Sequence, residues 1–147
     1  MSFPRCSPDG KYLVFTLADY GCFPIWHKEA DLYQVDLQNL ATGRLGLNSD
    51  FTDSYHSWSS NSKWMIFSSK RMDGLTGRPF ISYFDGNGNS SKPFVLPQED
   101  PEFYTNFLKS YNIPEFSTFK IDLHPGDIRE LAKSKAIQAL QGGKMIL

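Results

Sequence analysis

The sequence predicts a mainly β protein: two four-stranded β-propeller blades, forming a partial propeller, with an α-helical C-terminal extension. Two observations lead to this fold. Aromatic residues make up 15% of the 147 residues and accompany 11 Gly and 9 Pro, a composition that favours short strands and tight turns over a helical bundle. The chain also repeats itself in units of about 50 residues, which is typical of propeller blades.

Each unit begins with a turn that leads into a strand. Residues 7–15 recur as residues 59–67, and both copies read Ser, two turn residues, a polar residue, Lys, an aromatic, two aliphatic residues and Phe. Downstream, residues 32–36 match residues 81–85, and both segments end in Asp. The two units therefore share a turn, a strand, a connection and a further strand.

The expected strands follow this pattern in order. In the first unit they cover residues 3–6, 12–17, 31–36 and 44–47, and in the second residues 55–58, 64–69, 80–84 and 92–96. Pro8 and Gly10 suit a type I turn, and Asn61-Ser62 carries the same bend in the second copy. The Asp, Asn and Gly residues at 85–89 accept positive φ and predict a hairpin loop. A calcium loop is the weaker interpretation, because Gly and Glu are missing at its sixth and twelfth positions.

Residues 98–147 form the C-terminal extension. Asp100 is a good N-cap with Pro101 at the first helical position, which predicts a helix to about Ser110. Residues 116–121 are expected to add one more strand. A second helix opens at Pro125 and ends at Gly142-Gly143; its apolar stripe needs a partner surface and comprises Ile128, Leu131, Ala132, Ala136 and Leu140.

The repeated residues resemble the TolB-type β-propeller repeat, over residues 2–97 with units at about 2–50 and 51–97. The segment 54–114 is similar to the C-terminal part of TolB-like proteins of Bacteroides-type bacteria. This resemblance implies an exported parent protein in the periplasm or cell envelope. Propeller rings close with roughly four to eight blades, so we expect either a piece of a longer protein, which we favour, or a homo-oligomer in which three chains supply six blades.

Composition excludes several function classes. The net charge is −1 with a pI of about 6.3, which argues against a nucleic-acid binder that works by counterion release. No apolar run approaches a membrane span, and residues 1–4 lack a signal-peptide profile. Cys6 and Cys22 are expected to be free, packed thiols, although one disulfide between them is possible.

No catalytic or cofactor motif is present. The three histidines, His27, His56 and His124, do not form a HExxH or a close pair, so structural roles are expected, and His56 is placed to face a propeller channel. Gly-x-Ser-x-Gly and phosphate-binding glycine loops are also missing. The sequence therefore predicts a protein that is not an enzyme and has no cofactor and no metal.

The predicted function is a protein–protein interaction or scaffold module. Trp58 and Trp64 fall at repeat positions and are expected in the core, whereas the insertion 18–30 is expected to pack on the blade and offer Trp26 to a protein or peptide partner. The alternative is an accessory propeller that gates substrate in a larger hydrolase or peptidase. A third reading gives the two helices the role of a cap on the last blade. The candidate interaction residues are Tyr20, Phe23, Trp26, His27, His56, Lys70, Arg71 and Arg78.

Overall fold

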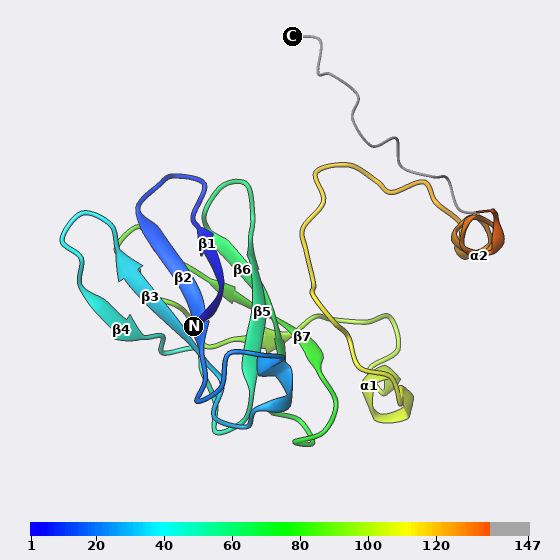
Figure 1. Ribbon diagram of the computed structural model, residues 1–147, viewed down its shortest axis with the longest axis horizontal. Coiled ribbons are helices and arrows are strands. Elements are labelled where there is room, and N and C mark those ends of the chain that lie inside the picture. Colours follow the sequence, from blue (N-terminus) through cyan, green and yellow to red (C-terminus); the bar gives the residue numbers. More distant parts are fainter. Residues whose placement is uncertain (136–147) are drawn as a thin grey trace, which may run out of the picture.

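The computed structural model describes residues 1–135, and their main body is a pair of antiparallel four-stranded sheets (Figure 1). Both sheets are simple meanders, with consecutive strands as neighbours. The first sheet comprises β1 (Ser2–Cys6), β2 (Tyr12–Leu17), β3 (Asp31–Asp36) and β4 (Thr42–Arg44). The second comprises β5 (Asp53–Trp58), β6 (Trp64–Ser69), β7 (Arg78–Tyr83) and β8 (Phe94–Val95). The predicted mainly β fold with two four-stranded sheets is confirmed.

The two sheets repeat the same turn at the same place. Ser7 Oγ lies 2.6 Å from Asp9 Oδ1 and accepts a hydrogen bond from the Tyr12 amide at 3.0 Å. In the second sheet Ser59 Oγ lies 2.7 Å from Asn61 Oδ1 and accepts a hydrogen bond from the Trp64 amide at 2.9 Å. The repeated Ser and Asp or Asn therefore build one turn geometry twice.

The first strand of each sheet also carries the same irregularity. The β1–β2 register shifts between Ser2 and Arg5, and the β5–β6 register shifts between Ser54 and Ser57. Each bulge contains a residue at positive φ, Phe3 at 51° and Tyr55 at 52°. Because bulges increase the local twist of a strand, the two first strands bend alike.

The core lies between the sheets. The buried apolar cluster takes Val14, Leu32, Leu45 and Leu47 from the first half and Met65, Phe67, Phe80 and Phe84 from the second. Trp58 packs against this cluster, 4.7 Å from the Phe84 ring, as expected. Trp64 does not, because it lies on the opposite face of β6, where it is partly exposed and meets Tyr83 edge-on.

Strand alternation leaves one outer face on each sheet. On the first sheet this face carries Leu13, Leu17 and Val35, which remain partly exposed, beside the buried Phe15. On the second sheet Ile66 and Ser68 are buried, whereas Trp64 and Tyr83 remain partly exposed. Part of the second face is covered by the chain itself, because Ser68 Oγ donates a hydrogen bond to the carbonyl oxygen of Tyr111 at 3.3 Å.

Several strand limits differ from expectation. Strand β4 ends at Arg44, because the following chain turns inward to bury Leu45 and Leu47. Strand β8 is reduced to Phe94–Val95. The segment 116–121, expected to be a strand, is not one: it has no strand partner among the described residues and is exposed. The hairpin at 85–89 is confirmed, with Asp85 Oδ1 accepting hydrogen bonds from the Asn87 and Asn89 amides.

The C-terminal helices are shorter than predicted. Helix α1 covers Phe103–Asn106, and its N-cap is Glu102 instead of Asp100. Helix α2 covers Pro125–Lys133, and Ser134 is already extended. None of the α2 side chains is buried against residues 1–135, so the expected partner surface is not found there. The predicted stripe residues Ala136 and Leu140 and the stop at Gly142-Gly143 lie outside the described residues.

Replacing Gly10 with alanine is expected to lower the free energy of unfolding by about 1–2 kcal/mol. Gly10 has φ +72°, and a Cβ there would meet no atom within 4 Å, so the cost is backbone strain alone. Gly86→Ala is the matched control, because its Cβ also meets nothing and its φ is not in the left-handed region. Urea denaturation measures the free energy of unfolding of both variants. Equal losses in Gly10→Ala and Gly86→Ala would contradict the strain argument.

Candidate functional site

A cleft of about 380 Å³ lies at one end of the sheets, where three separate parts of the chain meet. One wall is the short 3-10 helix η1 (Pro24–Trp26) with the residue before it. The floor comes from the β5 bulge and the end of β6, and the other wall comes from the C-terminal segment. The lining residues are Phe23, Ile25, Trp26, Tyr55, Lys70, Ser110, Tyr111 and Asn112.

The η1 wall presents aromatic side chains to solvent. Phe23 is 70% exposed and Trp26 is 76% exposed, whereas Pro24 between them is buried. The wall is fixed to the second sheet because Thr52 Oγ1 donates a hydrogen bond to the His27 carbonyl oxygen at 2.7 Å. The insertion therefore packs on the sheets through Pro24, as expected, whereas the rings of Phe23 and Trp26 remain exposed.

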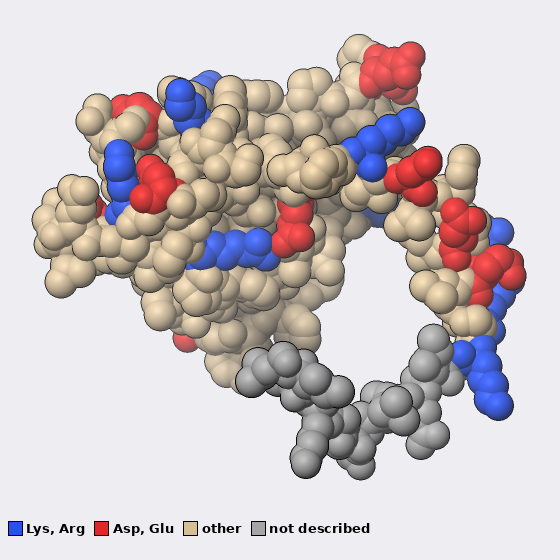
Figure 2. Space-filling view, turned by 90° about the horizontal axis from the view of Figure 1, so that it is seen from above, with Lys and Arg blue, Asp and Glu red and all other residues tan. Residues whose placement is uncertain are grey.

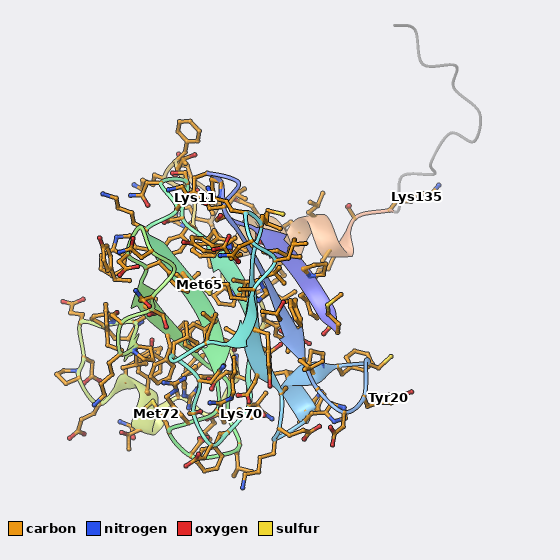
Figure 3. The ribbon with its side chains drawn as sticks, turned by 90° about the vertical axis from the view of Figure 1, so that its left-hand side faces the viewer. Lys11, Tyr20, Met65, Lys70, Met72 and Lys135 are labelled. Carbon is orange, nitrogen blue, oxygen red and sulfur yellow. The ribbon has the colours of Figure 1, made fainter. Side chains whose placement is uncertain are left out.

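The floor of the cleft holds a cation and a phenol. Lys70 is only 8% exposed, and its Nζ lies 4.5 Å from the centre of the Trp26 ring. Burial lowers the pKa of Lys70 and raises the pKa of Tyr55 relative to their usual values. Tyr55 is held in place by an edge-on contact with Phe3, ring centres 4.8 Å apart. Lys70 lies near the lower end of the molecule in Figure 3, as does Tyr20, and Lys11 lies at the opposite end.

Arg78 fixes the C-terminal wall and is not part of the surface. It is 3% exposed, and its guanidinium donates hydrogen bonds to the carbonyl oxygens of Lys109 at 2.6 Å, Phe107 at 2.6 Å and Tyr104 at 3.1 Å. The Phe107 and Lys109 carbonyls follow α1 and the Tyr104 carbonyl lies in its last turn, so Arg78 supplies donors that a continued helix would otherwise provide. The sequence predicted Arg78 as an interaction residue, and the structure instead places it inside, 3% exposed.

Arg71 is also turned inward. Its Nη2 donates to Asp53 Oδ1 at 2.7 Å and to the Leu47 carbonyl oxygen at 2.9 Å, and its Nε donates to Ser69 Oγ at 2.8 Å. Its guanidinium lies 4.7 Å from the Phe80 ring centre. Of the three basic residues singled out in the sequence, only Lys70 therefore reaches the cleft.

The remaining candidates lie outside the cleft. Tyr20 and His27 are neighbours on the insertion, ring centres 6.0 Å apart, and His27 Nδ1 is 3.2 Å from Glu29 Oε1. His56 is fully buried between the sheets, with Nε2 3.0 Å from the Val14 carbonyl oxygen, so it does not line a surface or a channel. Cys6 and Cys22 are free, as expected, but exposed instead of packed.

The cleft also contains residues that the sequence did not point to. Tyr55, Ser110, Tyr111 and Asn112 line it, and no local motif marks any of them. Tyr111 is held by hydrogen bonding of its amide to the Gly77 carbonyl oxygen at 2.9 Å. Two signals in the sequence could have pointed to them: Tyr55 is the repeat equivalent of the aromatic Phe3, and residues 103–111 contain too many aromatic side chains for a solvated tail.

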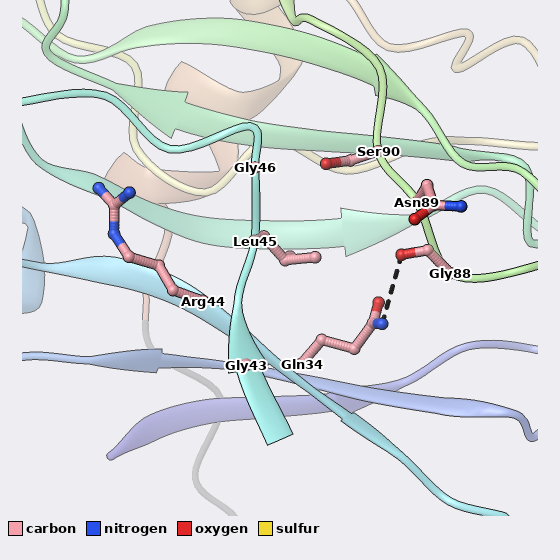
Figure 4. Close-up of a pocket in the computed structure, with 8 residues that line it drawn as sticks. All are labelled: Gln34, Gly43, Arg44, Leu45, Gly46, Gly88, Asn89 and Ser90. Atoms are coloured by element: carbon pink, nitrogen blue, oxygen red, sulfur yellow. Dashed lines mark hydrogen bonds between the residues drawn. The ribbon is translucent and has the colours of Figure 1, made fainter. Parts of the chain in front are cut away.

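A second cavity, of about 240 Å³, lies where the two sheets meet (Figure 4). Its lining includes Gly43 of β4, Gly46 shortly after β4, and residues Gly88–Ser90 of the β7–β8 connection. Gln34 Nε2 donates to the Gly88 carbonyl oxygen at 3.3 Å across it. A Cβ on Gly88 would lie 2.8 Å from Tyr12, so this approach requires glycine. We assign this cavity to the packing of the sheets.

The part of the chain that the structure describes contains neither a metal-ligand set nor a helix suited to cross a membrane. Among residues 1–135, no three His, Cys, Asp or Glu side chains lie together as a metal-ligand set. No helix within those residues is long and apolar enough to cross a membrane. On the face shown in Figure 2, acidic and basic side chains are interspersed, without a large patch of one sign.

No family model matches this chain, and no curated protein matches it. The resemblance to TolB-type repeats accordingly rests on the motifs in the sequence.

Proposed function

We propose that this protein is a non-enzymatic interaction module that binds a protein or peptide segment in the cleft between η1 and residues 110–112. One observation carries the proposal: two exposed aromatic rings, Phe23 and Trp26, stand at the edge of a preformed cleft. Aromatic anchors beside a desolvated pocket are enriched at binding hot spots. The volume of about 380 Å³ falls near the lower end of the usual range for binding pockets.

We also propose that the two sheets are consecutive blades of a propeller in a cell-envelope protein. The repeated turn and the repeated bulge support the equivalence of the two sheets. The partly exposed outer face of the first sheet, with Leu13, Leu17 and Val35, supports further packing on that side. The cell-envelope location is supported by the resemblance to TolB-type repeats alone.

Trp26→Ala is expected to reduce peptide binding by tenfold or more, because hot-spot aromatics contribute at least about 2 kcal/mol. The probe is a random peptide library displayed on phage, selected on the wild-type protein. Individual selected peptides are then titrated against the variant by fluorescence anisotropy. The expected result is saturable binding to the wild type and loss of that binding in Trp26→Ala.

Leu40→Ala is the matched control. Leu40 is about as exposed as Trp26 but lies on the β3–β4 turn, outside the cleft. If the selected peptides bind Trp26→Ala and Leu40→Ala as tightly as they bind the wild type, the cleft is not their binding site.

A further inference from the structure

We propose that the cleft recognises a carboxylate carried next to an apolar group, such as the end of a peptide whose last side chain is apolar. This inference rests on the proposed function and names the ligand chemistry of the same site. It depends on the position of one ammonium group, on the walls around it, and on the polar groups beside it.

Lys70 brings a positive charge that the described residues do not neutralise. Within residues 1–135 its Nζ has no hydrogen-bond acceptor in range and no carboxylate within 4.0 Å, and its contact is the face of the Trp26 ring. Asp73 is the nearby acid, but its carboxylate accepts the amides of Leu75 and Thr76 at 2.8 Å and is occupied by its own loop. The ammonium itself is not enclosed but opens on the cleft, so an anion that enters the cleft can pair with it.

The walls around this ammonium are apolar. Ile25, Phe23 and Trp26 form one side, and the Tyr55 ring forms the floor. An anion without an apolar group would leave these surfaces in water, whereas a ligand with both groups would bury them and pair the charge at once. Burial lowers the pKa of Lys70 from its usual value, and a bound carboxylate would oppose that shift because it favours the charged form.

Polar groups suited to a peptide backbone stand on the opposite wall. Ser110 Oγ accepts the Gly77 amide at 3.1 Å, which leaves its hydroxyl hydrogen to donate. The Asn112 side chain adds a second donor and acceptor at the same wall. The cleft thus offers a cation at its floor, apolar surface on one side and hydrogen bonding on the other.

Two sources can supply such a carboxylate: the C-terminus of a chain, or an internal Asp or Glu beside an apolar residue. Three synthetic probes separate them. The first is N-acetyl-Gly-Gly-Phe with a free carboxylate, the second is the same peptide as its C-terminal amide, and the third is N-acetyl-Gly-Glu-Phe amide. Dissociation constants are measured by following backbone amide signals of the ¹⁵N-labelled chain, in particular those of Tyr111 and Asn112.

We expect the free acid to bind the wild type at least about tenfold more tightly than its amide, as charged hydrogen bonds imply. Lys70→Met keeps the aliphatic stem and should remove this advantage, and Lys70→Arg should retain most of it. A preference for the Glu-containing amide over the free acid would support the inference with an acidic side chain as the source.

Equal binding of the acid and both amides to the wild type would overturn the inference. If Trp26→Ala then weakens all three probes, the interaction function stands and only the carboxylate preference falls. An acid preference that survives in Lys70→Met would also overturn it. Failure of the library selection described above would instead count against the function itself.

Discussion

Asp53→Ala is expected to destabilise the protein by about 3–5 kcal/mol, the largest effect of any single substitution considered. The Asp53 side chain is fully buried. Its carboxylate accepts hydrogen bonds from the Ser49 amide at 2.6 Å, from Ser49 Oγ at 2.9 Å and from Arg71 Nη2 at 2.7 Å. Removing it leaves the Arg71 guanidinium buried without its anion, which is the costly case for a buried pair.

This ion pair ties the start of β5 and the connection before it to the segment that follows β6. Asp53 begins β5, Ser49 lies in the connection before it, and Arg71 follows β6 and also reaches the Leu47 carbonyl oxygen. We therefore expect Asp53→Ala to loosen the contact between the two sheets near their common end. The midpoint of urea denaturation, with a fixed slope, measures the loss.

Asp31→Ala provides the comparison, because Asp31 also binds an arginine through two hydrogen bonds, to Arg44. The Arg44 side chain is 45% exposed, so this pair should contribute about 1 kcal/mol or less. Similar losses in the two variants would contradict the claim that burial makes the Asp53 pair special. The double variant Asp53→Ala with Arg71→Met should lose less than the sum of the single changes.

Acidification is the second large perturbation, and it acts through His56. Burial lowers the pKa of His56 from 6.5 to about 4. Above pH 6.5 the ring is neutral in the folded and unfolded chain alike. Below pH 6.5 the unfolded chain takes up a proton that the folded chain does not. The free energy of unfolding therefore decreases as the pH is lowered to about 4, by about 3 kcal/mol in total.

The comparison of pH 7.5 with pH 5.0 tests this directly. Over that interval His56 should account for about 2 kcal/mol of lost stability, and the variant His56→Gln should not show this part of the loss. Gln keeps a donor for the Val14 carbonyl oxygen, to which His56 Nε2 now bonds. His27 and His124 are present in both proteins, so the difference between the two proteins isolates His56. An identical pH dependence of the wild type and the variant would refute the assignment.

The sheets could be predicted because their signals are local. The strands at 12–17, 31–36 and 64–69 were predicted with the limits that the structure has. The repeat of Ser, turn residues and Lys determined both turns, and Ser62 adopts positive φ at 60° although it replaces the Gly10 of the first copy. Which face of each strand is buried was not predicted, and the repeat alone would mislead, because it aligns Val14 with Ile66 whereas the core takes Val14 and Met65.

The C-terminal segment and the cleft could not be predicted, because they depend on contacts between distant residues. Pro101 and the aromatic spacing favour a longer helix locally. Arg78, more than twenty residues away, binds the carbonyl oxygens of Tyr104 and Phe107 and fixes another path. Nothing near Arg78 or Arg71 in the sequence distinguishes a buried arginine from the exposed Lys or Arg of an ordinary loop.

Residues 110–112 make the two outer faces of the sheet pair unequal. On the second sheet Tyr111 accepts the Ser68 hydroxyl, so a further layer stacked there would have to displace this part of the chain. On the first sheet Leu17 is exposed, and no such contact of residues 110–112 would have to be displaced there. We therefore expect a further layer of structure to pack more readily on the first sheet than on the second.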